Sequence, residues 1–217
     1  MIEVEVIDYM GDDLTIVNAA RVSYGSESNQ MTERDEGLIN FLADHNHVTP
    51  FRHTAIQVRC KAPIFLARQL GKHQVGFSWN EISRRYKDGE AIPVEFFIPT
   101  IVFERPEKLM KDTAQPASLE MEKAFKDILL SSYKSSLKDY KRLLALGATP
   151  EQARMILPQG MMTEWIWTGL LYGFYSLWKQ RADPHAQYEA RLFASKIGNL
   201  MEELFPKCWA ALTKQKD

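Results

Sequence analysis

The chain has 217 residues, of which 45% are hydrophobic and 25% are charged, and its 27 basic and 28 acidic side chains leave a net charge of −1. This is the composition of an ordinary globular protein that is long enough to bury a core. Because the charges balance, broad charge-driven binding to nucleic acid or to a membrane surface is not expected.

The first half of the chain predicts strands that alternate with helices. Strands are predicted at residues 2–9 and 54–62, where apolar residues alternate with polar or charged ones. Helices are predicted at residues 13–23, at 33–45 behind the N-cap residue Thr32, and from Pro63 to Leu70. A short further strand is predicted at residues 94–99, "VEFFIP".

The second half of the chain is predicted to be mostly helical. An apolar stripe at helical spacing runs from Phe125 to Leu144 and ends before Gly147. A short helix is predicted from Thr149 to Leu157, and a last long helix from Asp183 to Pro206. We therefore expect an α+β fold in a single domain, residues 1–217, with a small, mostly antiparallel sheet, long helices and a helix-rich C-terminal half.

The segment "MMTEWIWTGLLYGFYSLW", Met161 to Trp178, approaches the length of a membrane span. It contains Glu164, charged residues follow it at once, and its tryptophans are spread along it rather than confined to its ends. A buried central helix, or a helix at a subunit interface, is the favoured interpretation. The N-terminus has neither the basic nor the apolar region of a signal peptide, so a cytoplasmic location is expected.

The stretch "RQLGKHQVGFSWNEISRRY", Arg68 to Tyr86, is dense in hydrogen-bond donors. A solvated helix face is one interpretation of such a charge-rich run. However, Gly71 and Gly76 indicate a turn, and Glu81, Ser83 and Arg85 share one side of any extended segment that follows it. A carboxylate, a hydroxyl and a guanidinium on one side suit a ligand that has both a phosphate and a polar ring, such as a nucleotide.

Other common motifs do not account for this stretch. "GKH" lacks the Ser or Thr of a P-loop, and no GxGxxG follows a predicted strand. His45, His47 and His53 could suggest zinc, but no carboxylate or cysteine is spaced to complete a ligand set, so no metal is predicted. Arg181 precedes a predicted helix start in "RADPHAQ", where an anion or a polarised carbonyl could be held.

At these residues the sequence resembles the flavin-dependent thymidylate synthases over most of its length. Six blocks in the family's order carry the resemblance: "MGDDLTIVNAARVSYG", "HVTPFRH", "KAPIFLARQ", "SWNEISRRY", "ARMILP" and "RADPHAQ". Two departures stand out. The family signature begins Arg-His-Arg, whereas this chain has Lys72-His73-Gln74 and one extra residue before Ser83. Around Leu170, Tyr172 and Ser176 the usual asparagine and arginine for flavin contact are missing.

The resemblance implies a homotetramer with sites shared between subunits, FAD as cofactor, dUMP as acceptor, 5,10-methylenetetrahydrofolate as carbon donor and NADPH as reductant. It places a set of mostly charged or polar residues against dUMP: Gln69, Lys72, Glu81, Ser83, Arg84, Arg85, Arg154 and Arg181. It places a second set near flavin or folate: Ser23, His47, Thr49, Lys72, His73, Gln74, Asn80 and Ser176.

Methylation of uracil requires a nucleophilic C5 carbon. Cys60 lies on the apolar side of a predicted strand and Cys208 follows Lys207, and neither is a favoured nucleophile. We expect Arg181 to act instead, by stabilising negative charge at the N3–O2 edge of the ring. Two other functions stay open: a related flavoenzyme with NADPH oxidase activity only, and a non-enzymatic RNA-binding module, which the balanced charge disfavours.

Overall fold

The computed structural model describes residues 1–85, 92–107 and 114–214, so Tyr86 of the donor-rich stretch lies outside the described part. The chain divides into two compact units, one of residues 1, 61–69 and 81–164, and one of residues 2–60, 70–80 and 165–217. That the 217 residues form a single domain stays a prediction. Among the described residues, no helix combines the length and the apolar character that crossing a membrane requires.

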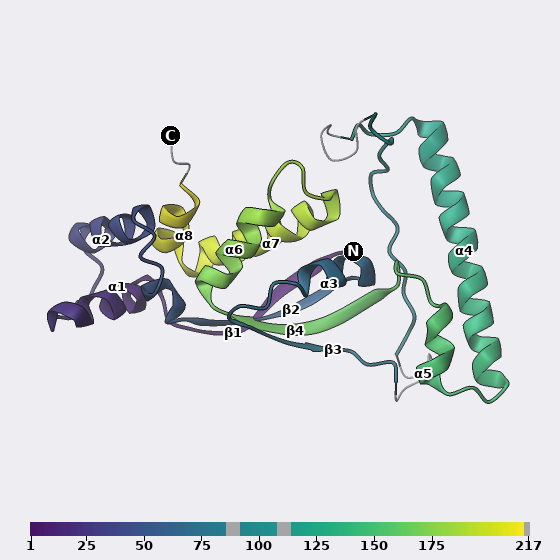
Figure 1. Cartoon of the computed structure of the whole chain (residues 1–217), viewed down its shortest axis with the longest axis horizontal. Coiled ribbons are helices and arrows are strands. Elements are labelled where there is room, and N and C mark those ends of the chain that lie inside the picture. The colour runs from purple at the N-terminus through teal and green to yellow at the C-terminus, as the bar shows by residue number, and fades with distance from the viewer. Residues whose placement is uncertain (86–91, 108–113, 215–217) are drawn as a thin grey trace. The chain divides into compact units, whose positions relative to one another are not determined.

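A four-stranded sheet forms the core of the second unit, and most residues of the sheet belong to that unit. The strands are β1 (Glu3–Met10), β2 (Ala55–Pro63), β3 (Phe77–Glu81) and β4 (Met162–Gly169), in the order β1-β2-β4-β3. Helices α6 (Leu171–Arg181) and α7 (Tyr188–Leu204) cover one face of it (Figure 1). The rings of Trp165 on β4 and Phe193 on α7 stack with centroids 6.1 Å apart, and both are almost completely buried.

The remaining helices of the second unit gather at one end of its sheet (Figure 1). They are α1 (Asp13–Arg21), η1 (Val22–Tyr24), α2 (Glu33–Asp44), η2 (Pro50–Arg52) and α8 (Pro206–Thr213). Capping boxes begin α1 at Asp12 and α2 at Thr32. The buried carboxylate of Asp13 accepts hydrogen bonds from the backbone N–H groups of Lys207 and Cys208, each at 2.9 Å. These bonds provide acceptors for backbone N–H groups in the first turn of α8 and connect that helix to α1.

The first unit is built around the long helix α4 (Leu119–Ala145) and contains α3 (Ile64–Leu70), α5 (Pro150–Ala153) and η3 (Arg154–Ile156). Helix α4 ends where Gly147 adopts a φ of +89°. On its buried side, the hydroxyl of Tyr133 donates to the carbonyl of Phe97 at 3.0 Å. A Cβ atom on Gly160 would lie 1.9 Å from that hydroxyl, so only glycine fits at this close approach.

The α+β fold class with a small antiparallel sheet and long helices is confirmed. The strands predicted from alternation at residues 2–9 and 54–62 and the N-cap at Thr32 are also confirmed. After Gly76 the chain is a strand only as far as Glu81, and Arg84 and Arg85 lie in a turn, so the extended segment predicted to place Glu81, Ser83 and Arg85 on one side is wrong. The short strand predicted at residues 94–99 is wrong, because within it only Phe96 pairs, in an isolated bridge to Met161.

Two predictions for the second half are also wrong. The tryptophan-rich segment is not one helix: its first part is β4, in which the buried Trp165 and Trp167 alternate with partly exposed residues, and only its second part is helical, in α6. The last long helix begins at Tyr188 rather than Asp183. There, the Asp183 carboxylate accepts from the backbone N–H of His185 at 2.7 Å, which holds a turn before the helix.

Candidate active site

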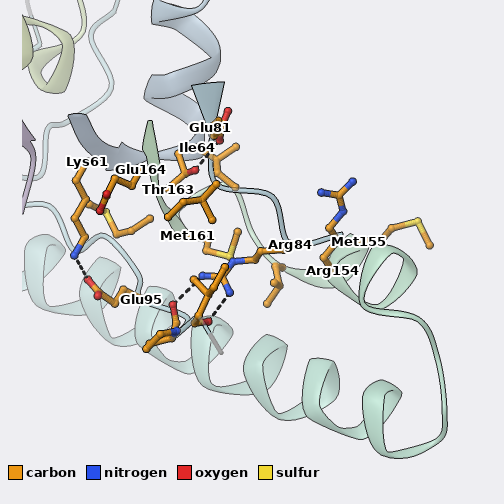
Figure 2. A pocket seen from close by; sticks show the side chains of 15 residues that line it. Lys61, Ile64, Glu81, Arg84, Glu95, Arg154, Met155, Met161, Thr163 and Glu164 are labelled. Atoms are coloured by element: carbon orange, nitrogen blue, oxygen red, sulfur yellow. Dashed lines mark hydrogen bonds and ion pairs between the residues drawn. The ribbon is translucent and has the colours of Figure 1, made fainter. Parts of the chain in front are cut away.

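The first unit contains a hollow of about 460 Å³ that is lined by several of the predicted nucleotide-binding residues (Figure 2). The walls of the hollow are formed by the segment after β3, by the start of β4 and by η3. Methionine and isoleucine side chains form its apolar part, and charged residues form its polar part: Lys61, Glu81, Arg84, Glu95, Arg154 and Glu164. The lining is therefore amphipathic, as ligand pockets usually are.

Arg84 fastens one wall of this hollow. Its guanidinium is buried and donates to the carbonyls of Ile92 at 2.7 Å and Pro93 at 2.8 Å (Figure 2). Burial lowers the pKa of Arg84 from its usual value. Two of the guanidinium nitrogens are thus already bonded to backbone, and the predicted contact between Arg84 and dUMP stays a prediction.

Of the other predicted nucleotide-binding residues of this unit, Glu81 and Arg154 line the same hollow, whereas Gln69, Ser83 and Arg85 do not. The Thr163 hydroxyl donates to the Glu81 carboxylate at 2.6 Å (Figure 2). Nε of Arg85 donates to the Glu151 carboxylate at 3.2 Å. Nε of Arg154 donates to the backbone carbonyl of Glu151 at 3.3 Å. Two arginines that were predicted to contact dUMP therefore meet at one residue of α5.

Three further observations complete this unit. Ser83 accepts from the backbone N–H of Arg85 at 3.3 Å. Gln69, on α3, has a buried Oε1 atom without a hydrogen-bond partner among the described residues. Thr163 was missed by sequence reasoning, although the alternation along residues 162–169 could have placed it on the same side of a strand as Trp165.

The second unit contains a hollow of about 480 Å³ beside the triplet Lys72-His73-Gln74. Its lining includes the cations Arg52, Lys72 and Arg181 and no carboxylate, together with Val75, Phe77, Leu170, Tyr172, Ser176 and Gln180. The loop before β3 comes close to the start of α6 here. Gly76 has a φ of +77°, and a Cβ at this position would lie 2.9 Å from the Leu170 side chain.

Arg181 and His73 are directly connected in this hollow. Nε of Arg181 donates to Nε2 of His73 at 3.1 Å. Nε2 therefore acts as an acceptor, which requires a neutral ring with its proton on Nδ1. Burial, and then the charge of Arg181, lower the pKa of His73 and so favour that neutral form. The contribution of the neutral His73 ring to the stability of the fold is complete above the ordinary histidine pKa. It is lost as the pH falls through the lowered pKa of His73.

Residues of α6 line both this hollow and a larger one of about 1170 Å³. Tyr172, Ser176, Gln180 and Arg181 belong to both linings. The Ser176 hydroxyl donates to the Tyr172 carbonyl at 2.8 Å, one helical turn earlier. Ser176, which was predicted to contact the flavin, thus lines both hollows with its hydroxyl proton bonded to the backbone, and its contact with the flavin stays a prediction.

Four predicted flavin or folate contacts lie elsewhere in the second unit: Ser23, His47, Thr49 and Asn80. All four are exposed, and none lines the hollows of 480 and 1170 Å³. The His47 ring packs edge-on against Phe41 with centroids 5.7 Å apart. In the part of the chain that the structure describes, no three or more His, Cys, Asp or Glu side chains are grouped to hold a metal ion.

Comparison with known proteins identifies the family. The family model described as "Thymidylate synthase complementing protein" matches residues 5–207. Two flavin-dependent thymidylate synthases are similar over 96% of this chain: that of Thermosipho africanus, 37% identical with 90% of its length covered, and that of Thermus thermophilus, 38% identical with 74% covered.

A solved structure agrees with these relatives. The UMP/dUMP methylase PolB from Streptomyces cacaoi, in its crystal structure bound with 5-Br dUMP, superposes with a TM-score of 0.88 at 28% identity, covering 98% of this chain and 95% of that one. The chain therefore belongs to the flavin-dependent thymidylate synthase family and is an enzyme of the methyltransferase class.

Proposed function

We propose that this enzyme converts dUMP to dTMP with FAD as cofactor, 5,10-methylenetetrahydrofolate as carbon donor and NADPH as reductant, without a covalent bond between enzyme and substrate. We also propose that it acts as a cytoplasmic homotetramer whose sites are shared between subunits. Membership of the family supports the methylation of dUMP, and PolB is itself a dUMP methylase.

The observation that carries the proposal is the composition of the 480 Å³ hollow of the second unit. Arg52 and Lys72, in a lining that has no carboxylate, suit the phosphates of a dinucleotide. Aromatic and apolar side chains from Phe77, Leu170 and Tyr172 suit a planar ring system. The lining therefore fits a flavin dinucleotide, which when bound supplies the electrons for the reduction.

For this chemistry we assign Arg181 the task of stabilising negative charge on the uracil ring. A guanidinium keeps its charge at every physiological pH and offers several N–H donors in one plane. Because His73 accepts from Nε, the two terminal nitrogens of Arg181 keep a defined direction. Donors that are oriented before the reaction stabilise developing charge more strongly than mobile ones.

On the nucleotide side we assign recognition to the residues of the first unit. Arg85 and Arg154 supply positive charge for a phosphate. Glu81 accepts from hydroxyl or ring N–H donors, and Thr163 fixes the orientation of its carboxylate. Gln69 and Ser83 add neutral polar groups, and Gln69 brings a buried oxygen without a partner among the described residues.

An absorbance titration of the purified protein with FAD, before and after addition of dUMP, tests this function. Flavin bands that shift on adding dUMP are expected, because the proposed reaction requires dUMP to bind close to the flavin. Release of tritium from [5-³H]dUMP, dependent on the folate and NADPH, is the matching catalytic result. Consumption of NADPH without release of tritium would instead identify an oxidase.

Replacing either cysteine by alanine is expected to leave turnover within about threefold of the wild type. Cys60 and Cys208 are completely buried. Burial raises the pKa of both thiols far above their usual value, and Asp13 raises that of Cys208 further. Neither thiol is therefore available as a thiolate nucleophile at neutral pH. Rates of dTMP formation by Cys60→Ala and Cys208→Ala check this, and inactivity of either variant with an unchanged circular dichroism spectrum would restore the thiolate route.

A further inference from the structure

Arg52 lies in the second unit at the end of η2, twenty residues before the triplet Lys72-His73-Gln74. Its guanidinium carbon lies 5.5 Å from the ring centroid of Tyr172, which is a cation–π distance. Both side chains line the 480 Å³ hollow. The fold therefore adds to this hollow a cation that is distant in sequence from the motif.

Within the described residues, the guanidinium of Arg52 has no hydrogen bond or ion pair, so its contact with Tyr172 is the interaction that orients it. A cation–π contact uses the charge of the guanidinium and leaves its N–H donors available for a ligand. The N–H groups of Arg52 can therefore donate hydrogen bonds to an oxyanion. The planar guanidinium has the geometry to bind two oxygens of such an anion at once.

The charges around the hollow also favour an anionic ligand. Arg52, Lys72 and Arg181 line it together and no acidic residue does. Like charges around one depression repel each other and raise the local concentration of anions. An anionic ligand removes that repulsion, and a diphosphate neutralises more of it than a single carboxylate would.

We propose that Arg52 is a further cofactor-binding residue, which pairs with the pyrophosphate of the flavin dinucleotide while Tyr172 holds its guanidinium in place. This inference rests on the proposed function, because it takes the anion in the hollow to be the flavin nucleotide. It assigns Arg52 a role in affinity for the cofactor and none in the chemical step.

The test is the dissociation constant of FAD, measured by quenching of flavin fluorescence with the full-length protein. The Arg52→Gln variant is expected to bind FAD on the order of tenfold more weakly, because a charge-assisted hydrogen bond to a phosphate is lost. The difference from the wild type should shrink as NaCl is raised, because salt screens exposed charges. Arg52→Lys, which keeps the charge without the planar fork, should lie between the two.

Arg34→Gln is the matched control, since it removes the same charge from an exposed position in the same unit that does not line the hollow. It should bind FAD as the wild type does. A dUMP titration distinguishes the two phosphate sources. Weaker binding of dUMP with unchanged binding of FAD would overturn the assignment, and so would a loss that is independent of salt or equal in Arg34→Gln.

The result also separates this inference from the proposed function. A wild-type protein that binds no FAD would overturn the proposed function and this inference with it. A wild-type protein that binds FAD, with Arg52→Gln binding equally well, would overturn the role of Arg52 alone.

Discussion

Arg181→Ala is expected to lower the rate of dTMP formation by about a hundredfold or more, since removal of one preorganised donor to a developing negative charge commonly has this effect. Most of the loss should appear in kcat rather than in KM, because the charge develops on the way to the transition state. Steady-state kinetics with saturating folate and NADPH measure this. Arg34→Ala, which removes an exposed charge of the same unit, should retain the wild-type rate.

The hydrogen bond between Arg181 and His73 allows the same prediction to be checked from the other side. His73→Gln keeps an acceptor near Nε of Arg181 and should retain more activity than His73→Leu, which keeps none. Near-normal turnover in Arg181→Ala would remove this residue from the chemistry. Equal losses in the two His73 variants would mean that His73 acts otherwise than by orienting Arg181.

Much of the fold could be predicted because its local signals agree with its tertiary structure. Alternation placed β1 and β2, and Thr32 is the N-cap of α2 as predicted, in a capping box with Asp35 that the structure adds. The tryptophan-rich segment failed for a physical reason. Bulky apolar residues suit both a buried strand and a buried helix, and only the period-two burial around Trp165 and Trp167 decides between them.

The site could be predicted only as far as its motifs extend. The stretch from Arg68 to Tyr86 indicated a nucleotide ligand, and the assignment of its residues to dUMP stays a prediction. Contacts between segments distant in sequence were not visible. Arg52 reaches Tyr172, and Thr163 reaches Glu81 across 82 positions of the sequence. The sequence does not distinguish the adjacent arginines Arg84 and Arg85, but the fold buries Arg84 and leaves Arg85 exposed.

Asp35→Ala is expected to lower the free energy of unfolding by about 3 kcal/mol, which is typical when one partner of a buried ion pair is removed. The Asp35 side chain is completely buried and is bonded to Arg21, Ser28 and Thr32. Hydrogen bonds from Thr32, Arg21 and Ser28 and the charge of Arg21 lower the pKa of Asp35 from 3.8 to about 2, although burial opposes this. Without the carboxylate, the mostly buried Arg21 loses its counter-charge.

The sign of the accompanying pH dependence follows from that lowered pKa. The folded protein binds the Asp35 proton less tightly than the unfolded chain does, so the stabilisation is complete above pH 3.8 and is lost as the pH falls toward 2. Urea unfolding at pH 7 measures the first effect, and thermal unfolding midpoints between pH 5 and 2 measure the second. Asp139→Ala, which breaks an exposed pair with Arg142 on α4, should change stability by less than about 0.5 kcal/mol. If Asp35→Asn lost stability with acid as steeply as the wild type, Asp35 would not be the group that titrates.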